Sequence, residues 1–525
     1  MKEFFKKNKL LFMILILIVF YFSFSIIITW DSAHYLSYVN IFEGKAPFSS
    51  WDIARGPVFP IILYLFNLLF GKMPQGILLG TFAFYLVFAI IVYCICKKIF
   101  SSFKHSKIWT ILITGFCILN PVIFGYYHVL LTEFVAITLS ILSCYLAWKW
   151  WNADSKKAKI LIALYFLIAV PFSYHLKQPY ICSTIIPMVI AAILALIHNH
   201  KWKNVLYYSG TVVGSLLVMA LSIITWNKIL EWKGVDMKTG RDTSSLLSGQ
   251  LLQGIQYFQI ENDFDFTLVD SNPYLTEEEK VYIKENLNEQ ENNLQVISIM
   301  NHNKIIEQDI IVVDQYQKPS TKDALAQIIK TFFKHPTIIM KNYLKNYCAL
   351  SSVCLIESPD GVNYKVTNQY DFMKLFENET IAYRVSSHLD NRFYLNDQGN
   401  ILSQNYQQVN TPGILIEIEK ALKMPTSIIY KFSILLLPVA LLALIFIRVL
   451  RRKHLKAYSL YTLSLILLGY AFLGVLANAL SGSIIDRYSV GMFIPGLLGI
   501  ISLITFLILN IKLEKGEITN EKRKS

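Results

Sequence analysis

The sequence predicts an α-helical polytopic membrane protein with about ten transmembrane helices, and three observations predict it. Hydrophobic residues make up 54% of the 525 residues and charged residues only 16%, whereas soluble domains carry about 25% charged residues. Uncharged runs long enough to cross a bilayer recur along the chain. Lys and Arg gather in short loops after every second run, which is the pattern of loops kept in the cytoplasm. This composition excludes a single soluble domain, a disordered tail and a small disulfide scaffold.

The spans follow from the hydropathy and the charges in order. The run 10–30 follows three lysines and lacks a small-residue cleavage site, so it predicts a signal anchor with a cytoplasmic amino terminus. The next apolar segment, 57–70, is too short to span and fits an interfacial or re-entrant helix in the first external loop. The lysine-rich loops that follow lie in the cytoplasm only if this segment does not cross the membrane. The remaining spans are expected at 73–96, 108–124, 129–151, 160–174, 179–197, 204–226, 425–447, 457–481 and 488–511.

The chain therefore divides into four expected parts. Residues 1–226 form a transmembrane module of seven spans, and 227–424 form a mixed, largely helical extracytoplasmic domain between spans seven and eight. Residues 425–511 add three spans, and 512–525 form a basic cytoplasmic tail. Within the external domain, the amphipathic run from Thr337 to Tyr347 fits the membrane surface. The expected location is the plasma membrane, with both termini in the cytoplasm.

The net charge of +13 is a consequence of this topology. The segments assigned to the cytoplasm hold the basic excess, while acidic residues outnumber basic ones in the rest of the chain. A basic face for nucleic acid is therefore not expected.

Ionisable residues lie in the external loops, at the ends of apolar spans. Burying a charge there is costly, so such residues usually have a function. They are Asp31, His34, Asp52 and Arg55 in the first loop, Glu133 in the second, Lys177 in the third, and Arg487, beside Tyr488, in the last. A carboxylate can take a proton from an attacking hydroxyl. Arg and Lys can stabilise a phosphate whose charge grows as it leaves. The set predicts group transfer from a lipid phosphate outside the membrane.

The loop motifs resemble a known family. The run Asp31-Ser32-Ala33-His34-Tyr35, then Ala54-Arg55-Gly56-Pro57 and a short apolar helix, resembles the first external loop of the GT-C glycosyltransferases. These include family-39 protein O-mannosyltransferases and lipid A aminoarabinose transferases. Leu131-Thr132-Glu133-Phe134 and Asp486-Arg487-Tyr488 also fit this family. The resemblance implies an inverting enzyme that transfers a sugar from a polyprenyl phosphate, in a bacterium undecaprenyl phosphate, to a glycan, lipid or protein acceptor outside the membrane.

The resemblance also implies roles for residues. Asp31 corresponds to the general base, Glu133 to a second catalytic acid that orients substrate or a cation, and Arg55 to a contact of the donor phosphate. The implied substrate-binding set is completed by His34, Asp52, Lys177, Arg487 and Tyr488. Several relatives carry a second acid directly after the first, and this chain has Ser32 there. Some members use a divalent cation and others do not, so the cofactor and any metal ligands stay open.

Structural roles compete with these functional ones. Asp31 could cap a helix, Arg55 could reach lipid headgroups, and Lys177 could be an ordinary loop charge. Trp51 and Trp226 fit an interfacial aromatic belt.

Two other function classes stay open. A polysaccharide polymerase or ligase of another membrane class would place its chemistry in the large external segment. A transporter or flippase would place charged or broken-helix sites near the midplane, where these spans carry almost no charge.

Overall fold

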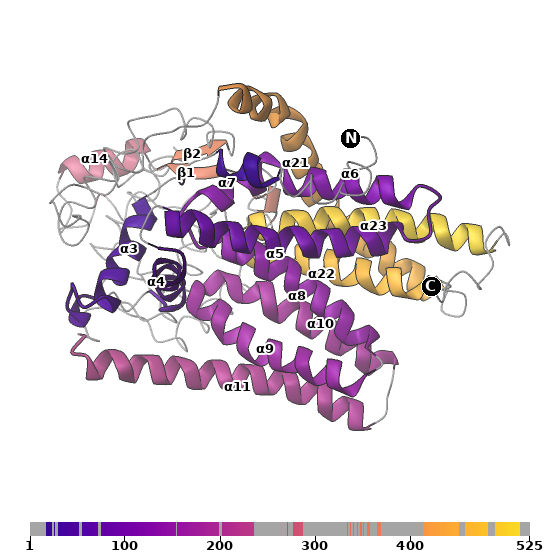
Figure 1. Cartoon of the computed structure of the whole chain (residues 1–525), viewed down its shortest axis with the longest axis horizontal. Coiled ribbons are helices and arrows are strands. Elements are labelled where there is room, and N and C mark those ends of the chain that lie inside the picture. Colours follow the sequence, from indigo (N-terminus) through magenta and orange to yellow (C-terminus); the bar gives the residue numbers. More distant parts are fainter. Residues whose placement is uncertain are drawn as a thin grey trace, which may run out of the picture.

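Long apolar helices dominate the part of the chain that the computed structural model describes (Figure 1). The described residues are 17–23, 26, 30–51, 55–71, 75–153, 155–198, 202–235, 270, 277–286, 333, 336–337, 340, 344, 347–348, 350, 354–357, 365–368, 413–450, 457–480 and 489–514.

Within these residues, eight helices are long and apolar enough to cross a membrane, and a ninth span results if one bent pair is counted as a unit. The eight are α5 (Gln75–Phe100), α8 (Glu133–Asn152), α9 (Lys156–Leu176), α10 (Cys182–His198) with the preceding 3-10 turn η2 (Gln178–Ile181), α11 (Trp202–Trp232), α21 (Gly413–Leu450), α22 (Tyr458–Leu480) and α23 (Val490–Glu514). The bent pair is α6 (Ser106–Ile118) and α7 (Pro121–His128), at 51°. The predicted class, an α-helical polytopic membrane protein, is confirmed.

The break between α6 and α7 has a local cause. Pro121 cannot donate a backbone hydrogen bond and so begins a new helix. The Asn120 side chain caps that helix by accepting from the backbone N–H groups of Val122 and Ile123. The carbonyl of Ile118, at the end of α6, accepts from the Tyr85 hydroxyl at 2.8 Å. The first N–H groups of α7 and the last carbonyl of α6 thus have side-chain hydrogen-bond partners inside the bundle.

The first predicted span lies mostly outside the described residues. Within it, residues 17–22 are helical and Ser23 forms a turn. The next helix, α3 (Trp30–Phe42), starts separately. The run 10–30 is therefore not one continuous helix. The helical part is fixed to the bundle by Tyr21, which is buried and whose hydroxyl lies 2.9 Å from Thr81 Oγ1.

The loop after the first predicted span contains α3, the short 3-10 turn η1 (Phe48–Ser50) and α4 (Val58–Phe70), of which α4 corresponds to the predicted short helix 57–70. α4 follows Pro57 and ends at Gly71, whose φ of 92° leaves the helical region. Its inner face is buried against α3, α5 and α9. The loop therefore covers one end of the bundle as a packed cap.

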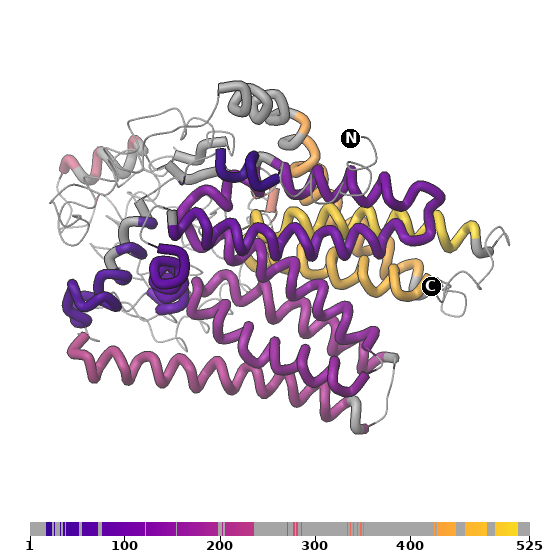
Figure 2. The backbone as a smooth tube through the Cα atoms, viewed as in Figure 1, coloured from indigo at the N-terminus to yellow at the C-terminus, as the bar shows by residue number. Residues whose placement is uncertain are grey.

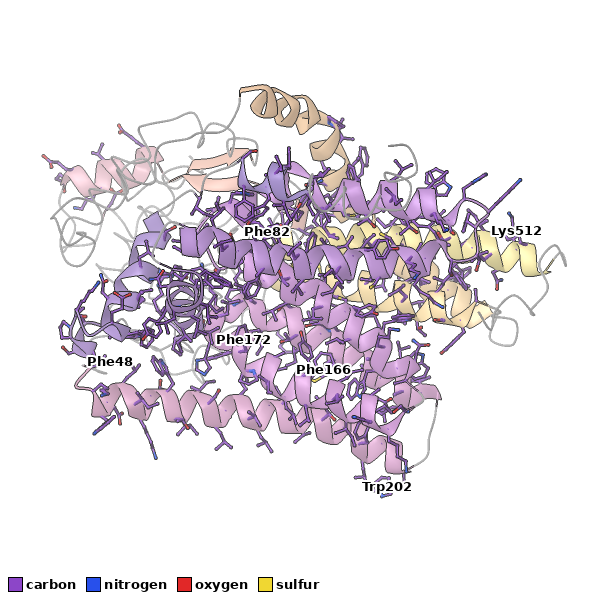
Figure 3. All side chains as sticks on the ribbon, in the orientation of Figure 1. Phe48, Phe82, Phe166, Phe172, Trp202 and Lys512 are labelled. Atoms are coloured by element: carbon purple, nitrogen blue, oxygen red, sulfur yellow. The ribbon has the colours of Figure 1, made fainter. Side chains whose placement is uncertain are left out.

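The molecule has two distinct ends. Figure 3 labels Phe48 at one end and Trp202 and Lys512 at the opposite one. α3, α4, α14 (Glu277–Asn286) and the hairpin of β1 (Cys354–Glu357) and β2 (Lys365–Asn368) gather at the end of Phe48 (Figure 1). The tube in Figure 2 shows α11 running the length of the bundle between the two ends. The helices α3 and α4 thus lie a full helix length away from the predicted cytoplasmic end.

Several helix boundaries differ from those predicted, and three of them are instructive. α8 begins at Glu133 and not at 129, α11 continues past 226 to Trp232, and α21 begins at Gly413 and not at 425. Pro425 lies inside α21 and does not start it. Hydropathy locates the apolar part of a span, but a helix continues into polar residues wherever its backbone bonds can form.

Candidate active site

The first turn of α3 is fixed to the loop in front of α8. Asp31 lies in that turn, and its backbone is described, whereas the side chains of Asp31 and His34 lie outside the described part. The adjacent Ser32 is fully buried, and its hydroxyl donates to the Leu130 carbonyl at 2.6 Å. Leu130 stands three residues before Glu133. The predicted catalytic residues Asp31 and Glu133 are therefore carried by two elements that are bonded to each other.

The stretch between α7 and α8 is short and irregular. α7 ends at His128, whose ring nitrogens lie 3.0 Å from the carbonyls of Phe124 and Tyr21. The Leu131 N–H then donates to the Val129 carbonyl at 2.8 Å, which turns the chain. His128 is thus a packing residue of the bundle, and the irregular turn exposes the Leu130 carbonyl to Ser32.

Glu133 is the first residue of α8 and is only 1% exposed. Thr132 Oγ1 donates to Glu133 Oε2 at 3.3 Å. The amino end of a helix favours a carboxylate, because its N–H groups and its dipole point toward it. A buried carboxylate is costly without such compensation. The role of Glu133 as a second catalytic acid stays a prediction.

Arg55 lies against α3. Its Nη1 donates to the Tyr35 hydroxyl at 3.2 Å, and its guanidinium carbon is 5.5 Å from the centre of the Tyr35 ring. Tyr35 follows Asp31 by four residues, and residues four apart share one face of a helix. Arg55 therefore lies along the face of α3 that carries Asp31.

The backbone of Arg55 is held by Trp51. The Trp51 indole N–H donates to the Arg55 carbonyl at 2.9 Å, and the ring stacks on Tyr38 of α3 at 4.2 Å. Trp226 of α11 meets Trp51 edge-on at 5.2 Å. Trp51 is 3% exposed, so its predicted place in a lipid-facing belt is wrong. It is a positioning residue for the Arg55 loop.

Gly56 brings this loop onto the end of α9. A Cβ at Gly56 would stand 2.0 Å from the carbonyl oxygen of His175, so only glycine fits. Lys177 follows two residues later, where the chain leaves α9 in an extended conformation and enters η2. The His175 ring lies 3.0 Å from Ser222 Oγ of α11. The loops of Arg55 and Lys177 are therefore in direct backbone contact.

Three predicted site residues, Asp52, Arg487 and Tyr488, lie outside the described residues. The residue directly after the last loop, Ser489, is described and lies 2.8 Å from the Tyr430 hydroxyl of α21. Among the described residues, no group of three or more His, Cys, Asp or Glu side chains is placed to hold a metal ion. The sequence leaves any metal ligands open, and the side chains of Asp31 and His34 are outside that search.

Besides Trp51, three residues that position the candidate site were not predicted from the sequence. From the sequence, Ser32 is only the residue that replaces a second acid after Asp31. Its buried hydrogen bond to Leu130 explains a serine there, because a carboxylate could not donate to a carbonyl. The four-residue spacing of Tyr35 from Asp31 could have predicted that both lie on one face of a helix. Gly56 precedes a proline, which marks a turn, but no sequence signal names its partner on α9.

The bond from Ser32 gives a testable prediction. Ser32→Ala leaves the buried Leu130 carbonyl without its donor, which should lower stability by about 1–3 kcal/mol. Thermal unfolding of the purified protein measures this. Ser101→Ala is the matched control, because Ser101 makes a similar hydroxyl-to-carbonyl bond of 2.9 Å to Lys98 in an exposed loop. Equal unfolding temperatures for the two variants would show that Ser32 does not fix α3.

Comparison with known proteins gives one similar solved structure. No protein-family model matches the chain, and no curated protein matches it. A solved structure that is similar is the crystal structure of ArnT from Cupriavidus metallidurans in the apo state, with a TM-score of 0.33 and 12% identity, covering 95% of this chain and 77% of that chain. At this similarity no residue role passes from one chain to the other.

Proposed function

We propose that this protein is an integral membrane glycosyltransferase of the GT-C type. It transfers a sugar from a polyprenyl-phosphate donor to a glycan, lipid or protein acceptor on the outer face of the plasma membrane. The proposal rests on one observation above the others. The elements that carry Asp31, Arg55, Glu133 and Lys177 contact one another at one end of the bundle, through Ser32 and Leu130 on one side and Gly56 and His175 on the other.

The chemistry follows from the residue types. Asp31 accepts the proton of the acceptor hydroxyl as its oxygen attacks the anomeric carbon of the donor sugar. The bond from that carbon to the phosphate oxygen breaks, the electron pair leaves with the phosphate, and attack from the opposite face inverts the carbon. Arg55 stabilises the charge that grows on the leaving phosphate, since a guanidinium matches phosphate oxygens with paired N–H donors. Lys177 adds a second positive charge beside that loop.

The remaining assignments complete the proposal. Glu133 orients the acceptor or a bound cation from the buried end of α8. His34, Asp52, Arg487 and Tyr488 bind substrate around the same loops. The site faces outside and both termini face the cytoplasm. The transmembrane module 1–226 carries the chemistry, and the segments 227–424, 425–511 and 512–525 form the external domain, the last three spans and the tail.

Arg55 tests the donor half of this proposal. Arg55→Gln should lower kcat/KM for a polyprenyl-phosphate sugar about 10-fold to 100-fold, because a charge-assisted hydrogen bond contributes about 1.5–3 kcal/mol. Initial rates of sugar transfer at varied donor concentration measure it. Lys45→Gln is the matched control, since Lys45 is a cation of the same loop that pairs with exposed Glu43 at 2.9 Å. An unchanged kcat/KM in Arg55→Gln would remove the phosphate role and favour chemistry in the large external segment.

A further inference from the structure

The carboxyl end of α11 packs on the first loop through a small hydrophobic cluster of its own, which we call the α11 cluster. Its members include Tyr38, Phe48 and Trp51 of the first loop and Trp226, Leu230 and Val235 at the end of α11. Figure 3 labels Phe48 beside this end of α11, and its ring lies 6.3 Å from that of Trp226. Trp226 and Leu230 are four residues apart, so one face of α11 carries both toward the loop.

The way in which α11 ends fixes two members of this cluster together. Gly234 has a φ of 78°. Its N–H donates to the Glu231 carbonyl, and the Val235 N–H donates to the Leu230 carbonyl, both at 3.0 Å. This is a Schellman motif, in which the residue after the glycine packs back on the last turn of the helix. Val235 and Leu230 are both buried, so the chain that continues beyond Val235 starts from the α11 cluster.

Two contacts lead from the α11 cluster to Arg55. The Trp226 ring meets the Trp51 ring edge-on at 5.2 Å, and the Trp51 indole N–H donates to the Arg55 carbonyl at 2.9 Å. The turn η1, which directly precedes Trp51, is only three residues long. It supplies little hydrogen-bonded structure of its own, so the position of the Arg55 backbone depends on what packs against Trp51.

The two indoles differ in the use of their N–H groups. The N–H of Trp51 bonds to Arg55, whereas Trp226 Nε1 is buried and has no hydrogen-bond partner among the residues that the structure describes. A buried donor without a partner costs free energy, so Trp226 contributes through the packing of its ring. An edge-to-face aromatic pair is stabilising and has a defined geometry. Trp226 therefore holds the Trp51 ring by shape alone.

We propose that the carboxyl end of α11 positions Arg55 for the donor phosphate, with Trp226 and Leu230 as positioning residues that act through Trp51. This inference rests on the proposed function, in which Arg55 contacts that phosphate. It joins two parts of the molecule that are far apart in the sequence. The segment that follows Val235 and the phosphate contact of Arg55 share one hydrophobic cluster.

Replacing each tryptophan by phenylalanine gives a first test, because the two variants should behave differently. Trp226→Phe keeps an aromatic ring and removes the unpaired donor, so kcat/KM for a polyprenyl-phosphate sugar should stay close to that of the wild type. Trp51→Phe removes the donor to the Arg55 carbonyl. It should lower kcat/KM about 10-fold, since a displacement of about 1 Å in a site costs about 10²-fold. Equal kcat/KM values for these two variants would overturn the proposal.

A double-mutant cycle with Arg55→Gln is the second test. Trp226→Leu removes the aromatic ring and should also lower kcat/KM about 10-fold, for the same sub-ångström displacement. In the Arg55→Gln background Trp226→Leu should have no further effect, because residues that act through one another are not additive. Trp232→Leu is the matched control, since Trp232 is the last residue of α11 and is 78% exposed. It should leave kcat/KM unchanged in both backgrounds.

The cycle separates failure of this inference from failure of the proposed function. If Arg55→Gln lowers kcat/KM but Trp226→Leu lowers it by the same factor with and without Arg55, Trp226 does not act through Arg55 and the inference is wrong. If Arg55→Gln itself leaves kcat/KM unchanged, the phosphate role of Arg55 is wrong, and the inference ends with it. A loss of packing alone would lower the unfolding temperature of Trp226→Leu without making its effect on kcat/KM depend on Arg55.

Discussion

Asp31→Asn should lower the kcat of sugar transfer about 10²-fold to 10⁴-fold, which is the contribution of a positioned general base. Asparagine has nearly the size of aspartate but cannot accept the proton of the acceptor hydroxyl. The KM for the donor should change little, because Arg55 and not Asp31 is proposed to bind its phosphate. Steady-state rates with the purified variant measure both constants.

Glu43→Gln is the matched control for Asp31→Asn. Glu43 follows the other end of α3, is exposed, and pairs with Lys45, so its loss of charge should leave transfer unchanged. Both variants should reach the membrane and unfold at the same temperature as the wild type. Full activity in Asp31→Asn would exclude a base at this position and would end the assignment of the site to α3.

Gly56→Ala should disable the site without touching a charged group. The new Cβ would stand 2.0 Å from the His175 carbonyl oxygen and 2.6 Å from its carbonyl carbon, and both belong to backbone that cannot turn aside. The Arg55 loop must move away from α9, at a cost of about 1–3 kcal/mol for an overpacked contact. A displacement of about 1 Å in a site can lower activity about 10²-fold. Thermal unfolding and transfer rates measure the two effects.

Gly210→Ala separates this effect from the general cost of replacing glycine. Gly210 lies inside α11 with no atom within 4 Å of an added Cβ. Alanine in a helix interior is favoured over glycine by about 0.5–1 kcal/mol, so this variant should be as stable as the wild type or more stable. If Gly56→Ala and Gly210→Ala behave alike, the contact between the Arg55 loop and α9 does not position the site.

The sequence was sufficient to predict the helical class and the position of most spans. Whether a segment spans the lipid depends on the composition of about 20 consecutive residues, and this composition can be read directly from a sequence. The same reasoning predicted the short helix that became α4, because its flanking Arg55 and Lys72 limit the apolar run.

The arrangement of the site could not be predicted in the same way. Ser32 and Leu130 are 98 residues apart in the chain, and only tertiary packing brings the hydroxyl to that carbonyl. The contact of Gly56 with His175 is between two backbones, which no side-chain pattern reveals. Trp51 has the composition of a belt residue, and its burial depends on Trp226 at the far end of α11.

The most direct test of the proposed function is release of sugar from a panel of radiolabelled polyprenyl-phosphate sugars by the purified protein, with acceptor lipids present. The account predicts that wild-type protein releases sugar from one donor and that Asp31→Asn does not. No release from any donor by folded wild-type protein would contradict the proposed reaction and shift the assignment to a polymerase, a ligase or a transporter.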